Sequence, residues 1–143
     1  MGGSGIHNEM RFSFPSHSIN EAVARTCVAA FAAVADPTVA ELADIKTAVS
    51  EAVTNAIIHG YENVTGTVEV RCVLSEGTIT VEVSDGGAGI SDIERAREPL
   101  YTSKPEMERS GMGFTVMETF MDEVSVESSP GAGTRVTMRK KLS

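Results

Sequence analysis

Residues 47–61 read Thr-Ala-Val-Ser-Glu-Ala-Val-Thr-Asn-Ala-Ile-Ile-His-Gly-Tyr and place polar side chains within an apolar helical pattern. Glu51, Asn55 and His59 recur at every fourth position, so on an α-helix they lie along one face. The neighbouring apolar face is formed by Val49, Val53, Ala56 and Ile57. An exposed polar face is the ordinary explanation of such a pattern, so a functional site requires support from other motifs.

The helix that contains this stretch has recognisable ends. Thr38-Val-Ala-Glu41 matches a capping box, in which the first and last side chains bond to each other's backbone N–H groups. Gly60 can adopt the left-handed conformation that terminates helices at little steric cost. We therefore predict one long helix from Thr38 through His59.

The region before this helix predicts a strand followed by another helix. Residues 10–14 alternate apolar and polar side chains, which is typical of a short strand, and Pro15 ends the pattern. Ser18-Ile-Asn-Glu21 then matches a second capping box and opens an alanine-rich and valine-rich run through Ala35. We expect the helix of this run to begin with the Ser18 side chain as its cap.

The region after the long helix alternates between strand and helix patterns. Apolar residues recur at every second position in two runs separated by a Glu-Gly turn, which predicts an antiparallel hairpin. Phe114, Met117, Phe120 and Met121 have helical spacing. The predicted elements are the hairpin 67–75 and 78–84, a helix 91–98, a polar connection 99–110, a helix from 114, and a strand pair 124–128 and 134–140.

This order of elements predicts the fold class. Antiparallel hairpins mixed with helices favour an α/β (α+β) two-layer sandwich, with a mixed, mostly antiparallel sheet and helices on one face. The pattern shows no internal repeat or interdomain linker, so residues 10–143 are expected to form a single domain. Residues 1–9 are expected to be a flexible tail that resembles a cloning remnant and lacks the apolar core of a signal peptide.

Composition and charge exclude several classes of function. The formal net charge is -8, which argues against a general nucleic-acid or membrane-surface binder because phosphate-rich partners require a basic face. No segment approaches the roughly 20 apolar residues of a membrane span. Cys27 and Cys72 form no CxxC or Cys/His cluster, so we expect reduced thiols in a cytoplasmic protein. Any phosphate group must be bound locally.

A second chemical motif, Asp85-Gly-Gly-Ala-Gly89, follows a predicted strand. An aspartate at a strand end can accept a hydrogen bond from an amine, and glycines such as Gly87 let a ligand approach the backbone. Taken alone, the motif is weak evidence, because Asp-Gly-Gly is more often a plain turn. The motif is neither a Walker A loop nor a dinucleotide fingerprint, because no Gly-Lys-Ser/Thr follows and no βαβ crossover is predicted.

A third motif, Gly111-Met-Gly113, opens the predicted helix after the polar connection. Helix N-termini present free N–H groups and a positive dipole end, which together attract anions, and glycine gives phosphate oxygens close access. Lys104 and Arg109 can add positive charge. The alternative explanation is an ordinary glycine hinge.

Together, Glu51-x-x-x-Asn55, Asp85-x-Gly-x-Gly89 and Gly111-x-Gly113, in this order, resemble the N, G1 and G2 boxes of the GHKL ATPase/kinase superfamily. The resemblance covers nearly the whole chain from Met10. It implies the Bergerat α/β sandwich, with ATP held under a mobile lid. Within the superfamily, the chain looks like the anti-sigma serine kinases of endospore-forming bacteria.

The resemblance also implies a role for each motif residue. Asn55 corresponds to the Mg²⁺ ligand, Glu51 to the catalytic base and Asp85 to the acceptor for the adenine amine. Thr134, in Gly-Ala-Gly-Thr, corresponds to the residue that supports the base. The remaining nucleotide-binding residues that it implies are Gly87, Gly89, Lys104, Arg109, Gly111, Met112 and Gly113. An asparagine oxygen suits Mg²⁺ because this ion keeps several waters and needs few protein ligands.

The implied partners are proteins. The resemblance implies that the chain inhibits a sporulation sigma factor (sigma-F), uses ATP and Mg²⁺ to phosphorylate a serine of an anti-anti-sigma factor, and forms a homodimer. Arg25 and Arg109 correspond to arginines that contact partners. His59 lies in the N box rather than on a separate dimerisation helix, so we interpret it as structural and not as a phospho-acceptor.

Three other functions use the same nucleotide site. The first is an anti-sigma kinase of a stress-response partner switch, and the second is a non-catalytic ATP-gated binding module that needs no working Glu51. The third is the catalytic fragment of a sensor histidine kinase. The short lid and the absence of an upstream helix pair bearing a histidine count against this last function.

Overall fold

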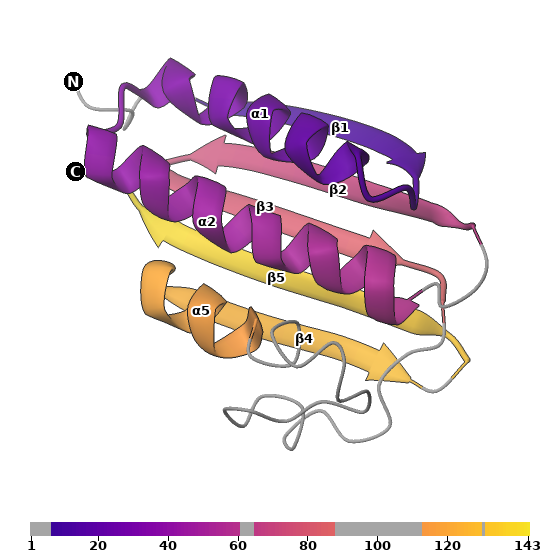
Figure 1. Ribbon diagram of the computed structural model, residues 1–143. Coiled ribbons are helices and arrows are strands. Elements are labelled where there is room, and N and C mark those ends of the chain that lie inside the picture. Colours follow the sequence, from indigo (N-terminus) through magenta and orange to yellow (C-terminus); the bar gives the residue numbers. More distant parts are fainter. Residues whose placement is uncertain (1–6, 61–64, 88–112, 130) are drawn as a thin grey trace.

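The computed structural model describes residues 7–60, 65–87, 113–129 and 131–143. In these ranges a five-stranded sheet, with strand order β1-β2-β3-β5-β4, is covered by helices on one face (Figure 1). The two-layer fold expected from the sequence is therefore confirmed. The expected sheet was mixed and mostly antiparallel, whereas every described strand pair is antiparallel.

The elements follow the predicted order, with small shifts at their ends. The N-terminal elements are β1 (His7–Pro15), α1 (Asn20–Ala32), η1 (Ala33–Ala35), α2 (Val39–Asn55) and the π-helical turn η2 (Ala56–Gly60). The others are β2 (Thr67–Ser75), β3 (Thr78–Asp85), α5 (Gly113–Phe120), β4 (Glu123–Ser129) and β5 (Gly133–Lys141). Residues 7–9, which the sequence assigned to the tail, pair with β2. The predicted helix 91–98 and connection 99–110 lie outside the described residues.

The two predicted capping boxes have opposite outcomes. At α2 the prediction is confirmed, because Thr38 Oγ1 accepts the N–H of Glu41 at 3.0 Å and the Glu41 carboxylate accepts the N–H of Thr38 at 2.8 Å. At α1 the prediction is wrong, because the cap residue is Ile19 and makes no side-chain cap bond. Ile19 already has helical dihedrals, and the Ser18 carbonyl rather than its hydroxyl accepts the N–H of Glu21.

The core fills the space between the sheet and the helices. α2 lies between α1 and α5 across the sheet (Figure 1). The predicted apolar faces of the long helix and of the β2–β3 hairpin are all buried, which confirms their periodicity. Their buried residues are Val49, Val53, Ala56, Ile57, Val68, Val70, Cys72, Leu74, Ile79, Val81 and Val83. Burial raises the pKa of the Cys72 thiol to about 12, so this cysteine is an unreactive core residue.

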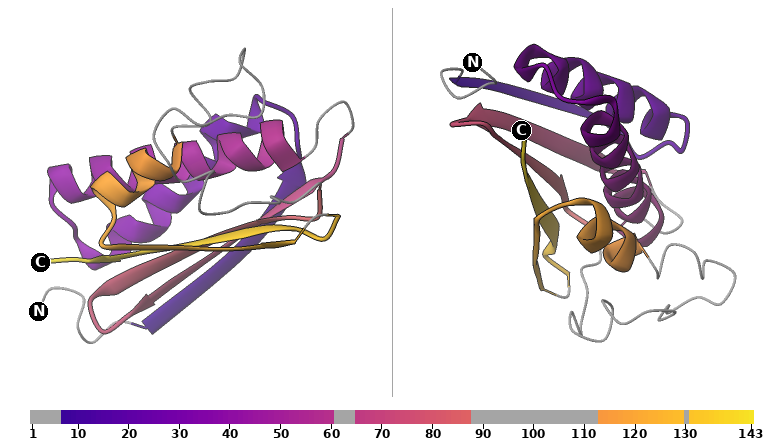
Figure 2. Two further views of the ribbon diagram at one scale, coloured as in Figure 1. Left: turned by 90° about the horizontal axis from the view of Figure 1, so that it is seen from below. Right: turned by 90° about the vertical axis from the view of Figure 1, so that its left-hand side faces the viewer.

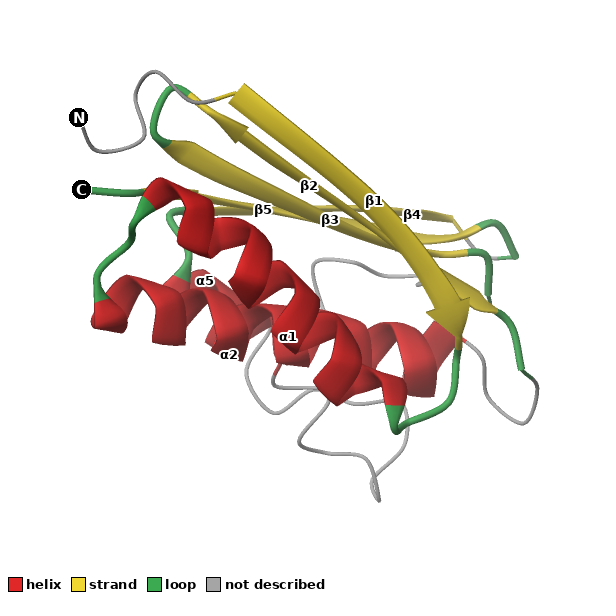
Figure 3. Ribbon diagram, turned by 90° about the horizontal axis from the view of Figure 1, so that it is seen from above, coloured by secondary structure: helices red, strands yellow, loops and turns green. Residues whose placement is uncertain are grey.

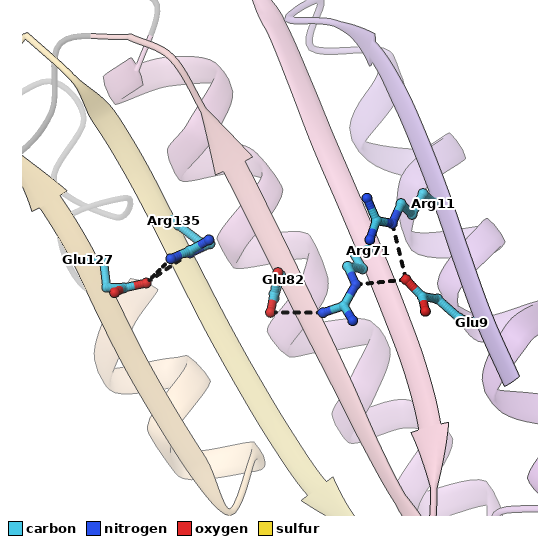
Figure 4. A network of polar contacts seen from close by, with 6 residues as sticks. All are labelled: Glu9, Arg11, Arg71, Glu82, Glu127 and Arg135. Carbon is cyan, nitrogen blue, oxygen red and sulfur yellow. Dashed lines mark hydrogen bonds and ion pairs between the residues drawn. The ribbon is translucent and has the colours of Figure 1, made fainter. Parts of the chain in front are cut away.

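The opposite face of the sheet carries no described helix (Figures 2 and 3). It is polar, and ion pairs link neighbouring strands across it (Figure 4). The Glu9 carboxylate accepts from Arg71 at 2.8 Å and from Arg11 at 3.1 Å, and Arg71 also contacts Glu82. On the same face, toward the β4 edge of the sheet, Arg135 pairs with Glu127 (Figure 4). Exposed pairs of this kind contribute little stability each, so this face is kept polar mainly by its alternating sequence.

Candidate functional site

A row of polar side chains lies at one end of the sheet, on the face that the helices cover. Asp85 on β3 pairs with Thr134 on β5, which pairs in turn with Ser128 on β4. Val83, two residues before Asp85, and Val136, two residues after Thr134, are buried beneath the helices. Because alternate residues of a strand face the same side, the polar row continues this buried apolar face. The apolar surface thus gives way to hydrogen-bonding groups at one end.

Asp85 is held in the row by backbone hydrogen bonds. The N–H of Gly87 donates to Asp85 Oδ1 at 3.0 Å, and the N–H of Thr134 donates to the same carboxylate. Burial raises the pKa of Asp85, and the two hydrogen bonds offset part of this shift. A carboxylate has about four lone-pair positions, so Asp85 keeps acceptor capacity for a ligand amine.

Gly133 brings β5 close to the end of β3. Its φ is +89°, a backbone conformation that residues with a Cβ rarely adopt. A Cβ at this position would lie 2.1 Å from the carbonyl oxygen of Asp85 and 2.8 Å from Gly86 Cα. Only glycine permits this approach, and the approach sets the spacing between Asp85 and Thr134.

Asn55 is the last residue of α2 and has a different environment from Asp85. The residue is only 9% exposed, and neither Oδ1 nor Nδ2 has a hydrogen-bond partner within the part of the chain that the structure describes. A buried polar group left unpaired costs about 1–3 kcal/mol. Such a group requires an explanation, and a bound ion or an ordered water is one that supplies the missing partner.

The π-helical turn η2 directly follows Asn55 and packs against β3 and β5, the two strands that carry Asp85 and Thr134. The end of α2 and the end of β3 lie on the same side of the molecule (Figure 1). Single π-turns within helices are frequent at functional sites. Glu51, one turn before Asn55, is half-buried on the same helix.

The structure brings together only some of the predicted site residues. Asp85, Gly87 and Thr134 are in contact, Glu51 and Asn55 share α2, and α5 begins at Gly113 as expected. Arg25 lies on α1, where its Nε is 3.2 Å from a Glu21 carboxylate oxygen. Five predicted residues lie outside the described residues: Gly89, Lys104, Arg109, Gly111 and Met112.

Two residues of this region were missed from the sequence. Ser128 and Gly133 appeared only as parts of a strand and a turn, yet both bond to or approach the polar row. The Gly-Ala-Gly-Thr motif carried a signal for Gly133, since a glycine beside a strand start marks close backbone approach. The signal for Ser128 was its register opposite Thr134 in the predicted strand pair.

These groups fit a magnesium nucleotide. The unpaired Asn55 amide offers an oxygen, the ligand type that Mg²⁺ prefers, in a buried position. Asp85 and Thr134 offer acceptors at a strand end, beside glycine backbone that a planar ring can approach.

Comparison with known proteins identifies the family. The family model described as the histidine kinase-like ATPase domain matches residues 14–140. The chain belongs to this family. Membership in this ATPase family confirms the resemblance to the GHKL superfamily that the N, G1 and G2 motifs carry.

Relatives within the ATPase family share most of their length with this chain. A protein of Thermoanaerobacter sp. (strain X514) called anti-sigma F factor is 62% identical over 135 residues, which cover 94% of both chains. A protein of the same name from Clostridium acetobutylicum is 56% identical over 137 residues, with 96% of both chains covered.

A solved structure supports the ATPase fold independently. A Mycobacterium tuberculosis protein containing RsbU and RsbW domains matches 94% of this chain and 32% of its own length, with a TM-score of 0.68 and 20% identity. At this identity the likeness establishes the fold alone. Among the described helices, none has the length and apolar character needed to span a membrane.

Proposed function

We propose that the chain is an anti-sigma factor and serine protein kinase, which inhibits a sporulation sigma factor (sigma-F) and uses Mg-ATP to phosphorylate a serine of the anti-anti-sigma factor. The observation that carries this proposal is the buried, unpaired Asn55 amide at the same end of the molecule as the Asp85–Thr134 row. The identity to proteins called anti-sigma F factor, at 62% over 94% of both chains, supports the partner class.

The chain's own residues divide the work of nucleotide binding. Asn55 would hold the metal through its amide oxygen, and Asp85 would accept a hydrogen bond from the adenine amine, with Thr134 beside it. Gly87 would lie against the base. The Mg²⁺ that Asn55 would hold would supply charge neutralisation for the phosphates. The Gly111–Gly113 segment, with Lys104 and Arg109, is proposed to bind the phosphates.

Glu51 is proposed as the general base. Its carboxylate would take the proton of the substrate serine hydroxyl as that oxygen bonds to the terminal phosphorus and ADP leaves. General-base assistance typically contributes about 10²–10⁴ in rate. Glu51 lies one helical turn from Asn55, so the proton acceptor and the metal ligand share one rigid element.

The partner surfaces are also a proposal. Arg25 on α1, together with Arg109, is proposed to contact the sigma factor or the anti-anti-sigma factor, and the chain is proposed to act as a homodimer. The Arg25–Glu21 pair is only partly buried, with 39% and 23% of the side chains exposed. The two contacting atoms, Arg25 Nε and Glu21 Oε2, are buried, so a partner would have to reach the outer part of the guanidinium group.

The test is a phosphotransfer assay. Purified protein would be incubated with labelled ATP, magnesium and the candidate anti-anti-sigma factor, and the phosphorylated residue would be located by peptide mapping. We expect phosphoserine on the partner. In Glu51→Gln, ATP affinity should stay within a few-fold while single-turnover phosphorylation falls by about 10²–10⁴.

Two results would change the proposal. Undiminished phosphotransfer by Glu51→Gln would remove Glu51 as the base. Nucleotide-dependent binding of the sigma factor without any phosphotransfer would instead favour an ATP-gated binding module.

A further inference from the structure

Ser128 contacts two oxygen atoms of β5 at the polar row. Its Oγ lies 3.0 Å from the carbonyl oxygen of Gly133 and 2.8 Å from Thr134 Oγ1. Both distances are those of ordinary hydrogen bonds between oxygen atoms. Ser128 is half-buried and faces the same side of the sheet as Thr134 and Asp85.

Counting protons fixes the direction of these two bonds. A carbonyl oxygen can only accept, so the bond to Gly133 uses the single hydroxyl proton of Ser128. The contact between Ser128 Oγ and Thr134 Oγ1 is then a hydrogen bond only if Thr134 is the donor. Both contacts are satisfied together by this arrangement alone.

Thr134 therefore presents lone pairs, and not its proton, to the remainder of the site. Its neighbour Asp85, held by backbone N–H groups, presents acceptors as well. Two adjacent acceptors match a group with two N–H bonds, such as an exocyclic amine. They oppose a carbonyl oxygen, because facing acceptors repel and each remains unpaired.

We propose that Ser128 is a positioning residue that fixes the Thr134 hydroxyl as an acceptor and so makes the site select 6-aminopurine over 6-oxopurine nucleotides. This inference rests on the proposed nucleotide-binding function and goes beyond it. Ser128 acts through Thr134 and need not touch the nucleotide. Without Ser128, the Thr134 hydroxyl can rotate and donate to a 6-oxo group.

The test compares ATP with inosine triphosphate, which carries a 6-oxo group in place of the amine. Titrations of each purified protein with both nucleotides give a selectivity ratio that does not depend on the active fraction of the sample. In Ser128→Ala we expect the ratio to fall by roughly three- to tenfold, the value of one neutral hydrogen bond. Ser125→Ala, an exposed serine on the same strand, is the matched control and should keep the parent ratio.

A second pair of variants separates proton direction from packing. Ser128→Thr keeps the hydroxyl and should keep the parent ratio. Ser128→Val has the shape of the threonine variant but no hydroxyl, so it should lower the ratio. In a Thr134→Val background, adding Ser128→Ala should leave the ratio unchanged, because the group through which Ser128 acts is gone.

Each outcome has one meaning. A selective parent whose ratio is unchanged in both Ser128→Ala and Ser128→Val overturns the inference and leaves the proposed function intact. A parent that binds both nucleotides equally also overturns the inference. A parent that binds neither nucleotide overturns the proposed function together with it.

Discussion

Asp85 and Asn55 lie at the same end of the molecule, but the polar atoms of Asp85 are hydrogen-bonded and those of Asn55 are not. Asp85 accepts two backbone N–H groups and belongs to a row whose spacing is set by Gly133. Asn55 is buried with neither polar atom paired among the described residues. The Asp85 end is complete without a ligand and suited to selection, whereas the Asn55 end is unfavourable until a ligand pairs with it.

The largest effect on stability is expected at Gly133, where the backbone of β5 comes close to the end of β3. Gly133→Ala should lower the free energy of unfolding by at least about 3 kcal/mol, because its Cβ would meet backbone atoms 2.1 Å away. Gly131→Ala is the matched control, since Gly131 also has a positive φ, +78°, but nothing within 4 Å of a Cβ. It should cost only about 1 kcal/mol in urea denaturation. Equal losses in the two variants would contradict the close approach of the strands.

The next largest effect, on ATP affinity, concerns the charge of the Asp85 carboxylate. Asp85→Asn keeps an oxygen for the Gly87 N–H but replaces one acceptor with a donor that faces the proposed amine. A charged hydrogen bond contributes about 1.5–3 kcal/mol, so ATP affinity should fall roughly ten- to hundredfold. Calorimetric titration would measure the loss. Equal affinities of the parent protein for ATP and GTP would count against Asp85 as the base-reading residue.

A smaller effect, an increase in stability, is expected when the unpaired Asn55 amide is replaced. Asn55→Leu replaces an unpaired amide with an apolar side chain of similar size, so the ligand-free protein should become more stable by about 1–2 kcal/mol. The same variant should lose the magnesium-dependent part of ATP binding. Thr54→Leu on the same helical turn controls for the gain in helix propensity that leucine brings. A destabilised Asn55→Leu protein would mean that Asn55 is not an unpaired group.

The smallest effect is a pH dependence of stability. Because burial raises the pKa of Asp85 above 3.8, the folded protein holds this proton more tightly than the unfolded chain. Its contribution to stability is present at pH values below 3.8 and is lost as the pH rises through the raised pKa. The parent should therefore lose stability relative to Asp85→Asn as the pH increases through this window. If the free energies of unfolding of the two proteins changed with pH in parallel, burial would not raise the pKa of Asp85.

The sequence predicted the framework well because periodicity and burial are closely linked. The apolar positions of α2, such as Val49 and Val53, and of the β2–β3 hairpin are buried as their spacing indicated. The Ser18 cap failed because the chain is already helical at Ile19, a backbone preference that no pattern of side chains reveals. Local rules therefore predict which residues form an element better than where it begins.

The candidate site was predictable only in part. The motifs named Asp85 and Thr134, but their contact depends on β3 pairing with a strand far along the chain. Four-residue spacing on a helix is equally compatible with exposed residues, so it could not predict that Asn55 is buried and unpaired. The role of Ser128 depends on hydroxyl proton directions, which appear only when its two oxygen partners are placed together.

The order of the strands also bears on how the protein folds. β2–β3 and β4–β5 are hairpins between consecutive strands, whereas the β3–β5 pairing joins two hairpins that are distant in sequence. Closing a long loop costs entropy before its contacts form, so we expect this junction to assemble after the hairpins. The polar row bridges the junction, since Asp85 belongs to one hairpin and Thr134 to the other. A ligand that binds both residues would therefore slow the separation of the two hairpins and lengthen the lifetime of the native state.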